Sequence, residues 1–193
     1  MLDLVAVEVR AGGLRAVVAA TPRLQSHIPK IALSTRHSDM ARWTDPVAWE
    51  KERNPEHCGV CARGVPDDAL AVLDATWVGM PDDGPMRGYC FLMLIDHAVE
   101  LHDLPPETGA AFMRDVQRVS AAVQRVTGAV KMNYEIHGNT VPHLHMHVFP
   151  RYPGDPFIGG PVNPKAIRHS VYAPGEYDSM RAALRDAITG PAR

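Results

Sequence analysis

Residues 143–150 read HLHMHVFP, and the three histidines in this stretch stand at every second position. The alternation of His143, His145 and His147 with apolar residues has the period of two that is typical of a β-strand, whose successive side chains point to opposite faces. The apolar residues would then enter the core. The three imidazole rings, each roughly 6.6 Å from the next along the strand, would line the other face.

The composition is that of an ordinary globular domain. The chain has 193 residues, of which 46% are hydrophobic and 22% are charged, and this length suits one domain with a substantial core. The net charge of -2 gives no general attraction to nucleic acid or to a membrane surface. The longest apolar runs, such as CFLMLI (90–95), have the length of a strand and are too short to cross a bilayer. We therefore expect neither nucleic acid nor a membrane as a partner.

The N-terminus and the cysteines favour a cytoplasmic protein. Asp3 and Glu8 stand where a signal peptide would carry positive charge, and Arg15 interrupts the apolar stretch. The chain has three cysteines, two of them in the pair Cys58-x-x-Cys61, which do not make the disulfide framework of a secreted domain. We expect a reducing compartment.

Residues 1–39 differ from the rest of the chain because they hold none of its aromatic residues. Two apolar pieces on either side of Gly12-Gly13 could form a small hairpin, and the following segment, TPRLQSHIPK (21–30), is typical of a linker. We interpret 1–39 as a non-catalytic N-terminal extension and 40–193 as the functional domain. Met40 opens a segment that resembles a natural start of translation.

From residue 40 onward the pattern predicts an α+β fold, and its clearest element is a helix over 106–127. Apolar residues recur there at spacings of three and four, which is typical of a helix with a stripe facing the core. Asp103 and Pro105-Pro106 mark its start, and Gly128 marks its end.

The other predicted elements are shorter. Helices are expected over 46–54 and 174–188. Loops are expected over 80–88 and 150–165 because prolines and glycines gather there. Strands are expected within 68–80, 89–95, 129–136 and 143–149. The last two strands are joined by the short segment HGNTVP, so they should be antiparallel neighbours.

The spacing alone leaves three interpretations of His143, His145 and His147. They could bind a metal together, because imidazoles are common zinc ligands and catalytic zinc often has three of them. One imidazole could instead attack an electrophile while its neighbours orient it. The third interpretation is a hydrogen-bonded histidine ladder without chemistry.

Polar residues upstream favour the nucleophile. Asn133, Asn139 and Thr140 lie next to the predicted strand, and Gly138 allows a close approach of the backbone. Amide and hydroxyl groups suit a phosphate, whose oxygens need donors without carboxylates nearby. A metal site would more often bring acidic residues. His137 lies in the turn, and we interpret it as an exposed bystander.

Cysteines give weaker signals. A single Cys58-x-x-Cys61 pair is compatible with half of a zinc site, with a redox pair or with no function at all, because a tetrahedral site needs two more ligands. Cys90 lies within a predicted buried strand and is interpreted as a core residue.

The stretch HLHMHVF matches the His-x-His-x-His-x-x motif, with x hydrophobic, of the histidine triad (HIT) superfamily. The segment HAVELHDLPPETGAAFMRDVQRVSAAVQRV (97–126) resembles the family's approach to its long helix. GNTVPHLHMHVFPR (138–151) resembles its Gly-Gln-x-x-x-His-x-His-x-His stretch, with Asn139 where glutamine is usual. The resemblance covers about residues 56–157. It implies an antiparallel sheet with a long helix and a C-terminal helix packed on it, and a homodimer.

The resemblance also implies a reaction. The middle histidine, His145, would attack the α-phosphorus of a nucleotide to give a nucleotidyl-histidine that water then cleaves. His147 would hydrogen-bond the phosphate, and Thr140 would assist the leaving group. Asn133 would contact phosphate or ribose, and Asn139 would contact the bridging phosphate oxygens.

Several functions remain open within this resemblance. The closest branch is that of dinucleoside polyphosphate hydrolases, such as diadenosine tetraphosphate hydrolases. A nucleoside phosphoramidase and a phosphorylase are the alternatives within the superfamily. A nucleotide-binding module with negligible turnover is an alternative from another class, as is a catalytic metallohydrolase. Asp82 and Asp83 are weak candidates for a ribose contact.

Bacterial histidine triad proteins and the related galactose-1-phosphate uridylyltransferases often bind zinc through two cysteines and two histidines. Carried over to this chain, the ligands would be Cys58, Cys61, His97 and His143. Two thiolates and two neutral imidazoles neutralise the ion and leave no open coordination position, so the zinc would be structural. His102 would lie at the helix entrance and take no part. No organic cofactor is expected.

Overall fold

The computed structural model describes residues 42–167 and 169–191, so the extension expected over 1–39 lies outside the described residues. The α-helices are α1 Pro46–Glu52, α2 Gly59–Arg63, α3 Pro106–Thr127 and α4 Glu176–Thr189. The strands are β1 Ala71–Val72, β2 Thr76–Gly79, β3 Cys90–Leu94, β4 Lys131–Glu135 and β5 His145–Arg151. Short 3-10 helices are η1 Arg42–Thr44, η2 Pro55–His57, η3 Leu101–Asp103 and η4 Pro164–Ala166. None of the helices in these described stretches is long and apolar enough to span a bilayer.

The five strands form one sheet in the order β1-β2-β3-β5-β4, and each pair of neighbours is antiparallel. The predicted pairing of the last two strands is confirmed, with Glu135 of β4 opposite His147 of β5. On its other side β5 pairs with β3, where Met93 lies opposite His145. The histidine strand is therefore an interior strand of the sheet.

Helix α3 confirms the predicted helix at both ends. Pro106 occupies its first turn, where a missing N–H costs nothing, and Gly128 ends it in a left-handed conformation with φ of 71°. Its buried residues include Phe112, Val116 and Val119, which are members of the predicted apolar stripe. The stripe faces the sheet because burying it against apolar strand residues provides most of the helix's stability.

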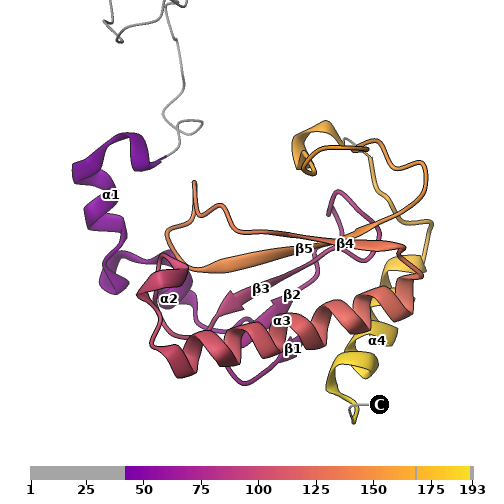
Figure 1. Cartoon of the computed structure of the whole chain (residues 1–193), viewed down its shortest axis with the longest axis horizontal. Helices are drawn as coiled ribbons and strands as arrows, with labels where there is room; N and C mark the ends of the chain where they lie inside the picture. The colour runs from indigo at the N-terminus through magenta and orange to yellow at the C-terminus, as the bar shows by residue number, and fades with distance from the viewer. Residues whose placement is uncertain (1–41, 168, 192–193) are drawn as a thin grey trace, which may run out of the picture. The chain divides into compact units, whose positions relative to one another are not determined.

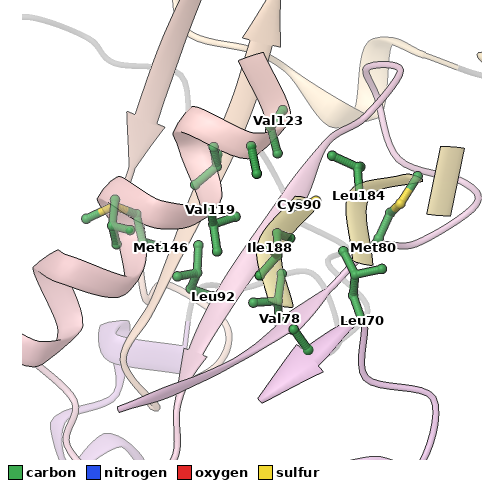
Figure 2. Close-up of a cluster of buried hydrophobic side chains, with 14 of the residues drawn as sticks. Leu70, Val78, Met80, Cys90, Leu92, Val119, Val123, Met146, Leu184 and Ile188 are labelled. Atoms are coloured by element: carbon green, nitrogen blue, oxygen red, sulfur yellow. The ribbon is translucent and has the colours of Figure 1, made fainter. Parts of the chain in front are cut away.

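The main hydrophobic core lies between the sheet and the two long helices, so the predicted α+β arrangement is confirmed (Figure 1). Figure 2 shows Val119 and Val123 of α3, with Leu184 and Ile188 of α4, around side chains of the strands. The strand residues in this cluster include Val78, Cys90, Leu92 and Met146. Cys90 is fully buried, as expected of a core residue.

The opposite face of the sheet carries the odd-numbered residues of β3 and β5, because side chains alternate along a strand. Phe91 and Met93 share this face with His145 and His147, their partners in register. Towards the far end of the sheet, Phe149 belongs to a second, smaller apolar cluster. That cluster also includes Tyr89 and Val162 and has Tyr152 and Phe157 packed against it. The loop after β5 therefore covers one end of this face.

Two predicted boundaries are wrong. The histidine strand was expected over 143–149 but runs over His145–Arg151. Before the strand, Leu144 pairs its N–H with the carbonyl of Ala98 at 2.7 Å, while the Leu94 N–H donates to the Leu144 carbonyl at 3.0 Å. These bonds tie the segment to the chain that follows β3. Within the expected loop 150–165, the first two residues continue β5 and the last two begin η4. Proline fits at position 150 because the pairing of β5 with β3 ends at Val148.

Candidate active site

The three histidines of the motif belong to two different surroundings. His143 precedes β5 and is completely buried, whereas His145 and His147 are half-buried on the face opposite the long helices. The rings of His145 and His147 lie 5.0 Å apart and nearly perpendicular, at 84°. The single histidine-lined strand face that the spacing predicted is therefore formed by two residues, and the third points elsewhere.

The hydrogen bonding of His145 fixes its tautomer. Its Nδ1 lies 2.7 Å from the carbonyl oxygen of His143. A carbonyl oxygen can only accept, so Nδ1 carries the proton and Nε2 keeps its lone pair. Burial lowers the pKa of His145, and the nearby His137 lowers it further, although the bond to the His143 carbonyl acts in the opposite direction. The side chain is thus a neutral imidazole near pH 7 with a nucleophilic Nε2.

His147 is also neutral. Burial first, and then the neighbouring His145 and His137, together lower the pKa of His147 to about 4. Its Nδ1 lies 2.6 Å from the hydroxyl of Tyr89, a buried residue whose ring stacks on Phe149 at 4.8 Å. Sequence reasoning missed Tyr89. The alternation of Tyr89 with Phe91 would have placed it on the same face, but not beside His147.

The second surrounding is a cluster of four ligand-type residues. The side-chain atoms of Cys58, Cys61, His97 and His143 all lie within 4.8 Å of one another. Cys58 caps the N-terminus of α2 and Cys61 follows one turn later, so both thiols lie at the same end of this short helix. The Cys58 sulfur is 3.3 Å from His143 Nδ1, and the Cys61 sulfur is 3.2 Å from His97 Nδ1.

Both histidines of the cluster present an unprotonated nitrogen to the thiols. His143 Nε2 donates to the Leu94 carbonyl at 2.9 Å, and His97 Nε2 donates to the Arg53 carbonyl at 2.7 Å. Such bonds to backbone carbonyls fix the tautomer and the ring orientation of metal-binding histidines. Two thiols with two imidazoles held in this way form the donor set of a structural zinc site, and the four residues fit that ion.

A metal site made of all three motif histidines does not form. His143 is held between the cysteines and the Leu94 carbonyl, and His145 Nδ1 is bonded to backbone. In the parts of the chain that the structure describes, the cluster with the cysteines is the one group of three or more such residues placed to hold a metal. His102 takes no part in it, because its side chain is 82% exposed.

A groove of about 400 Å³ opens on the same face of the sheet, beside α2. Its lining includes Trp77, Phe91 and Met93 from the sheet, and Thr140 from the loop before β5. Trp77 and Phe91 meet edge to face at 5.5 Å. Gly79 lies opposite Phe91 in register, and a Cβ there would overlap the Phe91 ring. Because Gly79 has no side chain, the Phe91 ring can pack directly against its backbone.

The other sequence-predicted residues are not all brought together. Asn133 lies on the same face as the histidines, opposite Phe149, and its side-chain oxygen accepts from Lys131 at 2.7 Å. Asn139 is exposed in the loop. Asp82 and Asp83 are exposed too and line a different groove, next to Tyr89. His137 is exposed as expected, yet its ring lies 6.2 Å from that of His147.

Comparisons with known proteins agree with this geometry. A family model described as the HIT domain matches residues 67–154. A histidine triad protein from Bradyrhizobium japonicum is 28% identical in sequence and superposes with a TM-score of 0.54, over 62% of this chain and 89% of that one. A histidine triad protein from Marinobacter aquaeolei VT8 is also 28% identical, with a TM-score of 0.54 over 64% and 90% of the two chains.

A third solved structure shares the fold at lower identity. It is a zinc-bound histidine triad family protein from Mycobacterium smegmatis, 24% identical, with a TM-score of 0.53 over 70% of this chain and 95% of that one. No curated protein sequence matches the chain significantly. The matched model and the shared fold show that residues 67–154 form a HIT domain with the fold of histidine triad proteins.

Proposed function

We propose that the protein cleaves a dinucleoside polyphosphate at its α-phosphorus, with His145 as the nucleophile. The superfamily is one of nucleotide-binding proteins and nucleotide hydrolases, and the proposal adds the substrate class and the intermediate. The observation that carries it is the bond from His145 Nδ1 to the His143 carbonyl. It leaves the lone pair on Nε2, an atom for which no partner lies among the described residues.

The proposed reaction has two displacements. In the first, the Nε2 lone pair forms a bond to the α-phosphorus while the bond from phosphorus to the leaving oxygen breaks, and that oxygen takes the electron pair. The imidazole then carries a positive charge, which the His143 carbonyl stabilises through the Nδ1 proton. In the second, a water oxygen bonds to phosphorus, the P–N bond breaks and the water releases a proton, which regenerates neutral His145.

Neighbouring side chains suit the roles proposed for them. His147 is a neutral imidazole whose Nδ1 is already occupied by Tyr89, so its Nε2 is available to a phosphate oxygen. Thr140 lines the groove and would stabilise the leaving oxygen with its hydroxyl. Asn133 and Asn139 remain proposed contacts to phosphate or ribose. The groove walls of Trp77, Phe91 and Met93 suit the flat face of a nucleobase, for which aromatic stacking is the usual mode of binding.

We further propose that Cys58, Cys61, His97 and His143 bind one zinc ion whose role is structural. All three cysteines of the chain are free thiols, which leaves this pair available as ligands. The zinc-bound relative from Mycobacterium smegmatis supports the assignment. When bound, the ion supplies a cross-link between α2 and the segment that precedes β5. The proposed reaction uses no side chain of this cluster, and of His143 it uses only the backbone carbonyl.

A homodimer is the assembly that we propose. Strand β4 lies at the edge of the sheet. Tyr134 in this strand is 50% exposed, and Val130 and Ile136, which flank the strand, are exposed by 65% and 37%. An exposed apolar edge strand is a template for pairing with a second chain. Light scattering should give the mass of two chains, and Tyr134→Lys should shift the protein towards one. A wild-type protein that is monomeric at high concentration contradicts this part of the proposal.

A substrate panel tests the function. The purified protein would be given diadenosine polyphosphates, adenosine phosphoramidate and nucleotide sugars, with the products identified and with added inorganic phosphate in a parallel series. Hydrolysis of a diadenosine polyphosphate to a nucleoside monophosphate supports the proposal. Faster turnover of the phosphoramidate, phosphate-dependent release of a nucleoside diphosphate, or binding without turnover would assign the phosphoramidase, the phosphorylase or the binding module instead.

A further inference from the structure

We propose that Tyr89 is a positioning residue that holds His147 with its proton on Nε2, so that this nitrogen donates to the phosphate in the reaction. The inference rests on the proposed function for its catalytic consequence, but not for the arrangement of the two side chains. It begins from the 2.6 Å contact between the Tyr89 hydroxyl and His147 Nδ1.

The direction of this hydrogen bond follows from the partners that each group has. A phenol can donate or accept, and so can the Nδ1 of an imidazole. Tyr89 is only 8% exposed, and His147 Nδ1 is the one hydrogen-bond partner that the described residues give its hydroxyl. If His147 donated, the buried O–H would be left without an acceptor, and an unsatisfied buried donor destabilises the folded state. Tyr89 therefore donates, and burial raises its pKa, which keeps the proton on the oxygen.

A neutral imidazole that accepts at Nδ1 carries its proton at Nε2. This tautomer is the opposite of that of His145, which donates at Nδ1 and keeps its lone pair on Nε2. The two neighbouring rings thus offer one nucleophilic nitrogen and one N–H donor. A displacement at phosphorus needs both, because negative charge remains on the phosphate oxygens while the nitrogen attacks.

The surroundings of Tyr89 keep it in place. Its ring stacks on Phe149 at 4.8 Å and on His147 at 5.9 Å, and Met86 and Val162 belong to the same buried cluster. The aromatic packing holds the hydroxyl at the imidazole.

The charged groups nearest to His147 do not compete for its Nε2 proton. Glu135 lies opposite His147 in register, but one of its oxygens is bonded to His137 Nε2 at 2.9 Å and the other accepts from the Val162 N–H at 3.2 Å. The remaining neighbour, His145, presents a ring edge at 5.0 Å.

Tyr89→Phe removes the hydroxyl and keeps the ring, and Tyr152→Phe is the matched control. Tyr152 belongs to the same cluster, and its hydroxyl donates a bond of equal length, 2.6 Å, to the Arg87 carbonyl without touching His147. Nitrogen-15 NMR of histidine-labelled protein reports the tautomer and the pKa of His147, whose signals are assigned by their loss in His147→Gln. This measurement needs no substrate.

We expect the Nδ1 signal of His147 to shift in Tyr89→Phe, a second tautomer to appear, and the pKa of His147 to rise because the lost bond favoured the neutral ring. We also expect kcat to fall about three- to tenfold with KM within about twofold, since one hydrogen bond is lost. Tyr152→Phe should leave the tautomer and kcat unchanged.

Unchanged His147 signals in Tyr89→Phe, or a wild-type His147 that is protonated at Nδ1, would overturn the proposal. A shifted tautomer with wild-type kcat would overturn its catalytic part. A wild-type protein without turnover on any substrate refutes the proposed function, and the NMR result then still decides whether Tyr89 fixes the ring.

Discussion

Replacing Cys58 with serine should remove the zinc. It should also show how strongly the activity of His145 depends on the metal site. Cys58 is 3% exposed, and its sulfur lies 3.3 Å from His143 Nδ1. The same residue, His143, accepts the bond that orients His145. The two sites therefore share one residue, although they use different atoms of it. Loss of the metal should loosen the His143 carbonyl without removing any group that takes part in the reaction.

The size of the effect on stability follows from linkage. An ion present at a hundred times its Kd stabilises the folded state by about 2.7 kcal/mol. For a domain of this size, each kcal/mol corresponds to about 2–4 °C in Tm, so Cys58→Ser should lower Tm by about 5–10 °C. We expect kcat to fall by about tenfold, because only the orientation of the nucleophile suffers.

The assay combines metal analysis by mass spectrometry, calorimetry with and without a chelator, and steady-state kinetics. Wild-type protein should contain one zinc per chain, and Cys58→Ser and Cys61→Ser should contain none. Cys90→Ser is the matched control, because that thiol is buried in the main core away from the cluster. If a chelator abolishes turnover at once in a protein that stays folded, the metal is catalytic and the reasoning fails.

Two further predictions concern the groove and the N-terminal extension. Gly79→Ala should displace the Phe91 ring, because the new Cβ would overlap it, and should raise KM about tenfold at similar kcat. In a Phe91→Ala background the same substitution should add little to KM. Gly59→Ala is the control and should be neutral, because a Cβ at position 59 meets open space. If Gly79→Ala raised KM equally in both backgrounds, its effect would not act through the Phe91 ring. A chain starting at Met40 should fold, dimerise and keep near full activity, measured by circular dichroism, light scattering and kinetics, since the proposed site lies beyond residue 57. If this shortened protein were insoluble, or if its activity fell tenfold, residues 1–39 would be part of the fold.

The sequence predicted best those elements whose periodicity reflects burial against the sheet. Helix α3 follows from its apolar stripe and from Gly128, because both signals can be read within the segment itself. The match to the histidine motif also indicated the fold. The start of β5 was misplaced, since the backbone before it is tied to Ala98, a contact across 46 positions that no local pattern encodes.

The site was predictable where a motif concentrates its residues and unpredictable where the fold assembles them. The resemblance implied a metal role for His143 that the alternating pattern concealed, because an alternation cannot tell which ring turns away from the strand face. Tyr89 comes beside His147 only through the pairing of β3 with β5, and Gly79 meets Phe91 only through the pairing of β2 with β3. Neither contact leaves a signal in one sequence.

The most direct test of the account is to trap the covalent intermediate. Protein mixed with a diadenosine polyphosphate would be quenched within its first turnovers under alkaline conditions, where a phosphoramidate survives, and analysed by intact and peptide mass spectrometry. We predict one adenylate per chain, attached to His145, absent in His145→Ala and present in the exposed control His102→Ala. An adduct on another residue, turnover without any adduct, or His145→Ala retaining more than a few per cent of the wild-type rate would contradict the central claim.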